Sequence, residues 1–229
     1  MKIAVIGAGG VGGYFGARLA RGGHEVTFVA RGRHLAAIRE RGLAIESALG
    51  DAIAHCPATD DLSTLGPVDV AMLCVKLWDV EATAPRLAAI VSNGGVVIPF
   101  QNGVESADRV AALLGPSHVL GGVAYIAATI RAPGVIAHTG TMARLRVGAF
   151  PGGPEDRAAA FADACRSAGV EIEYTPDIRR ALWEKFVFLA SFSGITSAAR
   201  SPIGVVRSDP DLRALLEAAM REAWAVGVA

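Results

Sequence analysis

The stretch KIAVIGAGGVGGYFGARL, residues 2–19, decides how this chain folds. Its apolar, β-branched start at residues 2–6 predicts a buried strand, and the glycine-rich segment Gly7–Gly12 follows at once. Beyond it, Val11, Phe15 and Leu19 recur at helical spacing, so a helix is expected there. A strand, a glycine-rich turn and a helix in this order predict a βα unit of the kind that binds dinucleotides.

The glycine-rich segment reads GAGGVG and matches the pattern GxGxxG, in which each glycine has a separate structural reason. The first allows a tight turn, the second lets a pyrophosphate approach the backbone, and the third lets helix and strand pack closely. Free N–H groups at the helix N-terminus favour the bound anion. The residues expected to hold the cofactor here are Gly7, Ala8, Gly9, Gly10, Val11 and Gly12. A plain glycine-rich turn is the alternative.

The second strand, expected at residues 25–29, indicates which dinucleotide binds. NAD enzymes usually carry Asp or Glu at the end of this strand, where it holds the ribose 2′-hydroxyl. Here the strand is followed by Ala30 and Arg31, with Arg33 close behind and no acidic residue near the strand end. A guanidinium suits the 2′-phosphate, so the predicted cofactor is NADPH. A solvated arginine is the alternative.

Apolar strands alternate with helical patterns through the first half of the chain, which predicts an α/β fold with a Rossmann-type parallel sheet. Further strands are expected at 43–46, 52–56, 68–75 and 95–99, and helices at 34–41, 78–91 and 106–114. The β-rich stretch 119–147, interrupted by Pro133-Gly134 and Gly140, predicts an appended β meander. A helix at 155–168 and a last strand at 169–174 follow.

From Pro176 on, the pattern is helical, with a break at Ser201-Pro202. We therefore expect an NADP-binding Rossmann domain at residues 1–176 and an all-helical second domain from residue 177 to 229, for substrate binding and dimerisation. The sequence ends inside a helical pattern, so this second domain is expected to be truncated.

Composition excludes several classes of function. Lys plus Arg and Asp plus Glu both number 22, so the formal net charge is near zero. This balance gives no electrostatic reason to expect binding to nucleic acid or to an anionic membrane. The three cysteines are dispersed without a CxxC pair, which argues against disulfides and a zinc site and favours a reducing cytoplasm. No histidine spacing indicates a metal, and no run reaches the roughly 18 apolar residues of a membrane span.

Two polar residues follow predicted strands directly. Lys76 comes after the strand at 68–75, and Asn102 after the strand at 95–99. Ligands of such sheets bind outside the carboxyl ends of the strands, so both residues are expected at the cleft. Lys76 would neutralise phosphate or substrate charge, and Asn102 would bond the nicotinamide ribose. A surface lysine and a turn asparagine are the alternatives.

Lys185 is the residue predicted to carry the chemistry. It lies in an otherwise apolar helix, and Leu189, Ser193, Thr196 and Arg200 fall along the same face. Polar groups on an apolar helix need partners or a ligand. A lysine in a dry cleft has a lowered pKa and can donate a proton near neutral pH. The alternative is that Lys185 extends to solvent or pairs with a carboxylate.

Five segments resemble the ketopantoate reductase (2-dehydropantoate 2-reductase) family in order and spacing: KIAVIGAGGVGGYFGARL, GHEVTFVARG, CVKLWD, PFQNGVE and ALWEKF. The resemblance covers essentially the whole chain. It implies NADPH-dependent reduction of a 2-oxo acid to a 2-hydroxy acid in pantothenate biosynthesis, with substrate held between a Rossmann domain and a helical domain.

The resemblance also implies roles for individual residues. Gly7–Gly12 and Arg31 would hold NADPH, with Ala128 as a further cofactor contact. Lys76 and Asn102 would contact cofactor and substrate, and Lys185 would donate the proton to the carbonyl oxygen.

The chain departs from the family's pattern at its substrate end. Leu189, Ser193 and Ile203 stand where well-known members have asparagines that bind substrate, which leaves Ser193 as the polar candidate. The serine and glutamate that complete the family's site have no counterpart here. Loss of amide donors disfavours a ligand that needs them. A family enzyme for a different 2-oxo acid or ketone, and a non-catalytic dinucleotide sensor, are therefore alternatives; a homodimer through the helical domain is expected.

Overall fold

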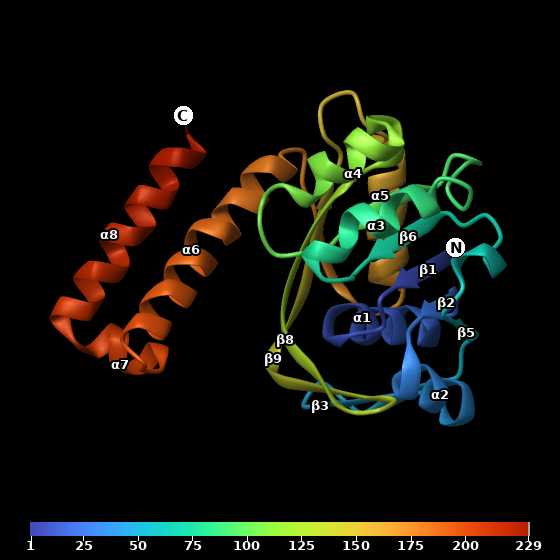
Figure 1. The fold of residues 1–229 in the computed structure, drawn as a ribbon, viewed down its shortest axis with the longest axis horizontal. Helices are drawn as coiled ribbons and strands as arrows, with labels where there is room; N and C mark the ends of the chain where they lie inside the picture. Colours follow the sequence, from blue (N-terminus) through green and yellow to red (C-terminus); the bar gives the residue numbers. More distant parts are fainter. Residues whose placement is uncertain (229) are drawn as a thin grey trace. The chain divides into compact units, whose positions relative to one another are not determined.

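Strand β1 (Lys2–Ile6) lies at the centre of a five-stranded sheet in the computed structural model, which describes residues 1–228 (Figure 1). The strand order is β5-β2-β1-β6-β7, and every pairing is parallel. The other strands of this sheet are β2 (Glu25–Val29), β5 (Ala58–Thr59), β6 (Val70–Leu73) and β7 (Val96–Pro99). The prediction of a Rossmann-type parallel sheet is confirmed.

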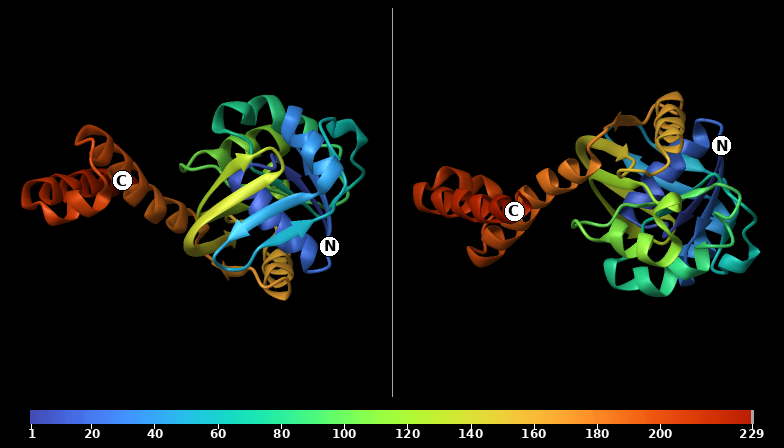
Figure 2. Two further views of the ribbon diagram at one scale, coloured as in Figure 1. Left: turned by 90° about the horizontal axis from the view of Figure 1, so that it is seen from below. Right: turned by 90° about the horizontal axis from the view of Figure 1, so that it is seen from above.

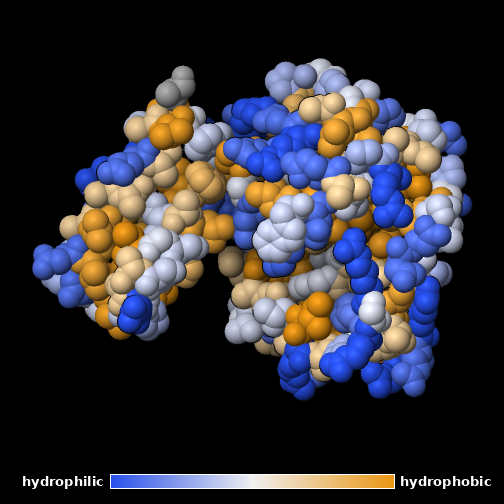
Figure 3. Space-filling model, viewed as in Figure 1, coloured by the Kyte–Doolittle hydropathy of each residue, from blue (hydrophilic) through white to orange (hydrophobic). Residues whose placement is uncertain are grey.

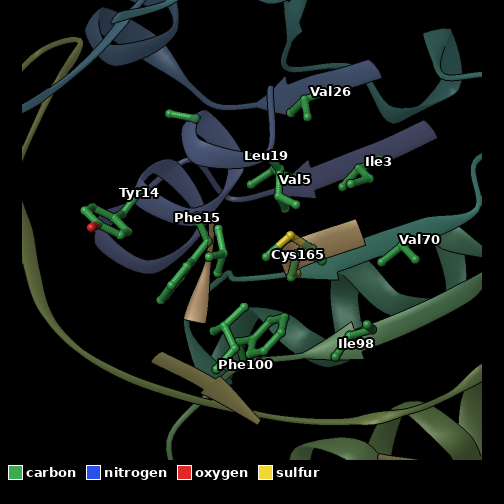
Figure 4. Packing of buried hydrophobic residues seen from close by; sticks show 14 of the residues in the cluster. Ile3, Val5, Tyr14, Phe15, Leu19, Val26, Val70, Ile98, Phe100 and Cys165 are labelled. Atoms are coloured by element: carbon green, nitrogen blue, oxygen red, sulfur yellow. The ribbon is translucent and has the colours of Figure 1, made fainter. Parts of the chain in front are cut away.

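Both faces of this sheet are buried. In β1, Ile3 and Val5 belong to one apolar cluster, whereas Ala4 and Ile6 belong to another on the opposite face. This explains why the strand reads as a continuous apolar run rather than an alternating one. Figure 4 shows the first cluster, in which Phe15 and Cys165 pack against strand residues.

Helices cover each face. On the first face lie α1 (Gly10–Arg21) and α5 (Glu155–Ser167), which bury Phe15 and Phe161. On the second lie α3 (Val80–Thr83), the 3₁₀ segment η3 (Ala84–Leu87) and α4 (Ser106–Leu114). The remaining short helices outside the second unit are α2 (Gly32–Arg41), η1 (Leu62–Thr64), η2 (Leu77–Asp79) and η4 (Pro116–His118).

The predicted meander forms a second sheet. Its strands are β3 (Leu43–Ser47), β4 (Ala52–Ala54), β8 (Gly121–Ala132), β9 (Val135–Gly148) and β10 (Glu171–Tyr174). β8 and β9 form a long antiparallel hairpin, which Figure 2 shows as a curved ribbon. β9 pairs in parallel with β3 through its first half and with β10 through its second half. The strand at the end of this region therefore joins the second sheet, not the first.

Two expected boundaries were wrong. The helix expected at 78–91 is three short pieces, η2, α3 and η3; Pro85 lies in the third, where it lacks the N–H that an α-helix needs. The expected break at Gly140 does not end β9. Instead, the register between β8 and β9 shifts there, because Ile126 pairs with Ala143 and Ala128 with His138, so the extra residues of β9 form a bulge.

The chain divides into two compact units. Met1–Gln101 and Glu105–Ile178 form the first, and the second holds Asn102–Val104 and the chain from Arg179 on. The second unit is helical, with α7 (Ile203–Ser208) and α8 (Pro210–Gly227) following α6 (Ile178–Ala198), most of which belongs to it. The prediction of helices after the sheet is confirmed, whereas the functional division at residue 176 stays a prediction. Among residues 1–228, no helix is long and apolar enough to cross a bilayer.

Candidate functional site

The glycine turn joins β1 to α1 and is fixed onto β2. The N–H groups of Gly7 and Ala8 both donate to the carbonyl oxygen of Val29, at 3.0 and 3.1 Å. Gly7 has φ +103°, which favours glycine, and a Cβ there would lie 2.9 Å from the carbonyl carbon of Cys74. A Cβ at Gly12 would collide with the carbonyl oxygen of Gly7. The first and third glycines of the pattern are therefore required by packing.

Gly9 is different, because a Cβ built on it would meet no atom within 4 Å. Its φ of −77° suits any residue, so neither packing nor backbone conformation requires glycine here. The remaining reason for a glycine here is the open space in front of the turn, which a pyrophosphate would need. Gly9 is also the N-cap of α1, whose first turn has no acidic residue. The N–H groups of that turn have no acceptor within the helix, so the local chemistry fits a diphosphate.

A cleft of about 280 Å³ opens at the carboxyl edge of the parallel sheet, beside the glycine turn. Its lining comes from the turn, from the ends of β2 and β6, and from the short helices on the second face. The lining residues are Ile6, Gly7, Ala8, Gly9, Val29, Ala30, Arg31, His34, Asp60, Leu62, Cys74, Val75, Lys76, Asp79, Thr83, Arg86 and Ile130. This is the edge at which ligands of such sheets bind.

Ala128 lies on β8, against the glycine turn. A Cβ at Gly10 would collide with the carbonyl oxygen of Ala128. The backbone of the second sheet therefore lies so close to the turn that no side chain fits between them. The structure thus brings together Gly7–Gly12, Arg31, Lys76 and Ala128 of the predicted site in the first unit.

Arg31 is exposed, lines the cleft and has no ion pair within residues 1–228. No acidic residue directly follows β2 in the sequence, but one lies near its end in the fold, so that expectation was wrong. The reason is that β5 pairs in parallel with β2, and the N–H of Ala30 donates to the carbonyl of Thr59 at 3.0 Å. Asp60, the next residue, therefore lines the same cleft. Its carboxylate lies 3.9 Å from the guanidinium of Arg39, so the charge left uncompensated at these two strand ends is that of Arg31.

His34 lines the cleft and was not predicted. Its Nε2 lies 2.8 Å from the carbonyl oxygen of Ala8, and its Nδ1 accepts from the N–H of Gly134 at 2.9 Å. Because Nδ1 is an acceptor, Nε2 carries the proton and donates it to Ala8. The imidazole thus joins the glycine turn to the β8–β9 turn. No signal in the sequence indicated His34, because its two hydrogen-bond partners, Ala8 and Gly134, are far from it in the chain.

Lys76 is exposed and lines the cleft where the chain leaves β6. Gln101, which follows β7, is only 8% exposed and was also not predicted. Its Nε2 donates to the carbonyl oxygens of Leu73 and Val75, at 2.9 and 3.0 Å. The carboxamide therefore connects the ends of two neighbouring strands just before Lys76.

Asn102 and Lys185 form a direct contact within the second unit. The Lys185 ammonium donates to Oδ1 of Asn102 at 2.8 Å, although the two residues are 83 positions apart. Burial lowers the pKa of Lys185 from 10.5 to about 8. An ammonium with this pKa is mostly charged at neutral pH yet gives up its proton far more readily than an ordinary lysine.

The other positions of the predicted stripe on α6 differ from one another. The hydroxyl of Thr196 donates to the carbonyl of Phe192 at 2.7 Å, so the helix itself satisfies this group. Ser193 is exposed, and Leu189 is partly buried. Among residues 1–228, no group of three or more His, Cys, Asp or Glu side chains is arranged to hold a metal ion.

Comparisons with known proteins agree with one another. The model of a family described as "Ketopantoate reductase PanE/ApbA" matches residues 3–152, and that of its C-terminal part matches residues 177–229. A protein of Bacillus subtilis named "Uncharacterized oxidoreductase YkpB" is 30% identical over 90% of this chain and 68% of its own length. A 2-dehydropantoate 2-reductase of Mesorhizobium japonicum is 30% identical over 99% of this chain and 76% of its own.

A comparison with solved structures also finds 2-dehydropantoate 2-reductases. The 2-dehydropantoate 2-reductase of Geobacter metallireducens superposes with a TM-score of 0.92 at 30% identity, covering 99% of this chain and 75% of the other.

Proposed function

Because the chain belongs to the ketopantoate reductase family, we propose that it is an oxidoreductase that reduces a 2-oxo acid to the 2-hydroxy acid with NADPH. The substrate is 2-dehydropantoate or a relative. The observation that carries this proposal is the Lys185 ammonium, which donates to Asn102 at 2.8 Å and whose pKa burial lowers to about 8.

The cofactor site consists of the glycine turn, Arg31, Lys76 and Ala128. N–H groups of the first turn of α1 hold the pyrophosphate, for which the open side of Gly9 leaves room. NADPH, when bound, supplies a hydride to the carbonyl carbon of the substrate. The side chains of this protein bind and orient it, and the cationic Lys76 balances phosphate or substrate charge.

Arg31 favours NADPH over NADH, because its guanidinium has no competing ion pair in the described chain, whereas the charge of Asp60 is opposed by Arg39. A charge-assisted hydrogen bond to a phosphate contributes about 1.5–3 kcal/mol. Arg31→Ala should therefore raise the Kd of NADPH by roughly 10- to 100-fold and change that of NADH far less.

Arg33→Ala is the matched control for this test. It removes the same charge two residues later, on a side chain that does not line the cleft. Equal losses of NADPH and NADH affinity in Arg31→Ala would rule out recognition of the 2′-phosphate.

Lys185 donates its proton to the carbonyl oxygen as the hydride arrives at the carbonyl carbon. The C=O π bond breaks, a C–H bond and an O–H bond form, and the lysine is left as the neutral amine. Oδ1 of Asn102 accepts a hydrogen bond from the ammonium at 2.8 Å and so helps to orient it. A positive charge next to the carbonyl oxygen also stabilises the negative charge that develops there.

The residues at positions 189, 193 and 203 favour a substrate that makes fewer polar contacts than 2-dehydropantoate makes in the family's well-known members. Leu189 and Ile203 offer no hydrogen bonds, and Ser193 offers one hydroxyl. A family enzyme that acts on another 2-oxo acid or on a ketone is therefore the second candidate.

NADPH oxidation, measured against 2-dehydropantoate, 2-oxo acids with apolar side chains and simple ketones, distinguishes the candidates. Lys185→Ala should lose most of the turnover while keeping its affinity for NADPH. Tight NADPH binding without turnover on any compound would favour the sensor alternative instead.

Self-association through the helical unit and a cytoplasmic location stay predictions. Large apolar side chains of α6 and α8 are exposed, among them Phe188, Leu215 and Trp224, and Figure 3 shows apolar surface on these helices. Such surface favours association with a second copy. Sedimentation velocity at increasing protein concentration tests this.

A further inference from the structure

Gln101 holds a buried position that the proposed chemistry does not use. It is the only glutamine in the sequence, and it stands between Phe100 and the functional Asn102. Its side-chain nitrogen donates both hydrogens, to the carbonyl oxygens of Leu73 and Val75. Its Oε1 is buried and has no hydrogen-bond partner in the described chain. The two carbonyls therefore fix the orientation of the carboxamide.

The segment that Gln101 holds forms one wall of the cleft. Leu73 is the last residue of β6, and Cys74, Val75 and Lys76 all line the cleft. Cys74 also lies so close to Gly7 that a Cβ there would be 2.9 Å from its carbonyl carbon. A shift of this segment would change both the packing against the glycine turn and the starting point of the Lys76 side chain.

Only a primary carboxamide suits this position. The NH₂ group of glutamine supplies an N–H donor to each of the two carbonyl oxygens. The carbonyl oxygen of Leu73 also accepts from the backbone N–H of Phe100 at 3.0 Å, so it is Val75, beyond the end of β6, that the carboxamide adds to the anchored segment. A glutamate carboxylate would place negative charge against two acceptors, and methionine, of similar length, would donate nothing.

We propose that Gln101 is a positioning residue for the cofactor site: its carboxamide holds the segment from Leu73 to Val75 against the glycine turn and so sets where Lys76 meets the dinucleotide. The inference rests on the proposed function, because it concerns binding of the same cofactor.

The first test is the Kd of NADP⁺ for Gln101→Met, measured by titration calorimetry. Loss of both donors should raise the Kd roughly tenfold. Ile98→Val is the matched control, because Ile98 is fully buried in β7, forms no part of the cleft lining and loses only a methylene group. This control should be destabilised while it retains the Kd of the unaltered protein.

Gln101→Glu separates positioning from a general loss of stability. At pH 8 the carboxylate cannot donate, whereas at pH 6 the fraction protonated can donate one hydrogen bond. The titratable group within this segment is the thiol of Cys74, whose pKa burial raises to about 12, so it does not change charge in this range. The Kd ratio between pH 8 and pH 6 should be several-fold larger for Gln101→Glu than for the unaltered protein and Ile98→Val.

A measurement on the unaltered protein covers the case in which Gln101→Met does not fold. Protein labelled with ¹⁵N at glutamine side chains should give one NH₂ pair, whose protons exchange slowly with water and whose shifts change when NADP⁺ is added. Fast exchange of these protons with water, or chemical shifts that stay the same when NADP⁺ is added, would contradict the proposal.

The outcomes are distinguishable. If the unaltered protein does not bind NADP⁺, the proposed function fails and this inference fails with it. If the unaltered protein binds NADP⁺ and a folded Gln101→Met binds it equally well, or Gln101→Glu shows no extra pH dependence, the inference alone is overturned.

Discussion

Lys185 shows how one side chain obtains its chemistry from its surroundings. An exposed lysine with a pKa near 10.5 holds its proton too firmly to be an efficient acid at neutral pH. Burial lowers the pKa of Lys185 to about 8, and Oδ1 of Asn102 accepts a hydrogen bond from its ammonium. The same residue in a polar, solvated helix would be an ordinary surface cation. The proposed role of Lys185 as an acid therefore depends on its burial as much as on its own amine.

The lowered pKa predicts a pH profile for the reduction. Below about pH 8 the ammonium is present and can donate its proton, whereas above that value the neutral amine predominates, so kcat should fall as the pH rises through about 8. Lys185→Arg keeps the positive charge with a pKa too high to titrate, so the residual activity should lack this limb. Stopped-flow measurement of NADPH oxidation from pH 6 to 10 checks the prediction. A descending limb that survives in Lys185→Arg would assign it to another group.

At the scale of elements, α6 ends in a Schellman motif built on an unfavourable residue. The N–H of Ser201 donates to the carbonyl of Thr196, and that of Arg200 to the carbonyl of Ser197. Arg200 has φ +48°, the one positive value among the described non-glycine residues. Glycine is the usual residue at this position because a Cβ costs about 1–2 kcal/mol in the left-handed region.

Arg200→Gly should therefore stabilise the protein. Relief of the left-handed strain outweighs the greater chain entropy of glycine in the unfolded state, so the free energy of unfolding should rise by about 0.5–1 kcal/mol. Urea denaturation followed by circular dichroism measures the change. Ala198→Gly, at the last residue of α6, should lower the stability by about 1 kcal/mol because its conformation is helical. Equal effects from both substitutions would show that the motif does not store this strain.

For the molecule as a whole, binding of the dinucleotide and stability of the fold are linked. The glycine turn is held by β2 and by the imidazole of His34, and it packs against Cys74, which follows β6, and against Ala128 of β8. A ligand seated on this turn contacts a site that exists only when these elements are assembled. Such a ligand stabilises the folded state by mass action, by about 2.7 kcal/mol at a hundred times its Kd.

Gly9→Val tests this linkage without disturbing the free protein. Because a Cβ at Gly9 meets nothing within 4 Å and its φ suits any residue, the stability without cofactor should change by less than about 1 kcal/mol, whereas the stabilisation by NADPH should disappear. Gly10→Ala is the counterpart: its Cβ collides with Ala128, so it should destabilise the free protein. Thermal unfolding with and without NADPH measures both. A normal NADPH shift in Gly9→Val would place the pyrophosphate elsewhere.

The sequence by itself determined the parallel sheet, the glycine turn and the cation after β2, because each depends on residues that are neighbours in the chain: an apolar run, a spacing of glycines, a strand followed by Arg31. Only the tertiary structure decided what surrounds them. Asp60 reaches the end of β2 through the pairing of β5, His34 contacts Gly134 across 100 positions, Gln101 holds the end of β6, and Asn102 meets Lys185. These contacts come from elements that pack side by side although they are far apart in sequence, and no local pattern encodes such pairing.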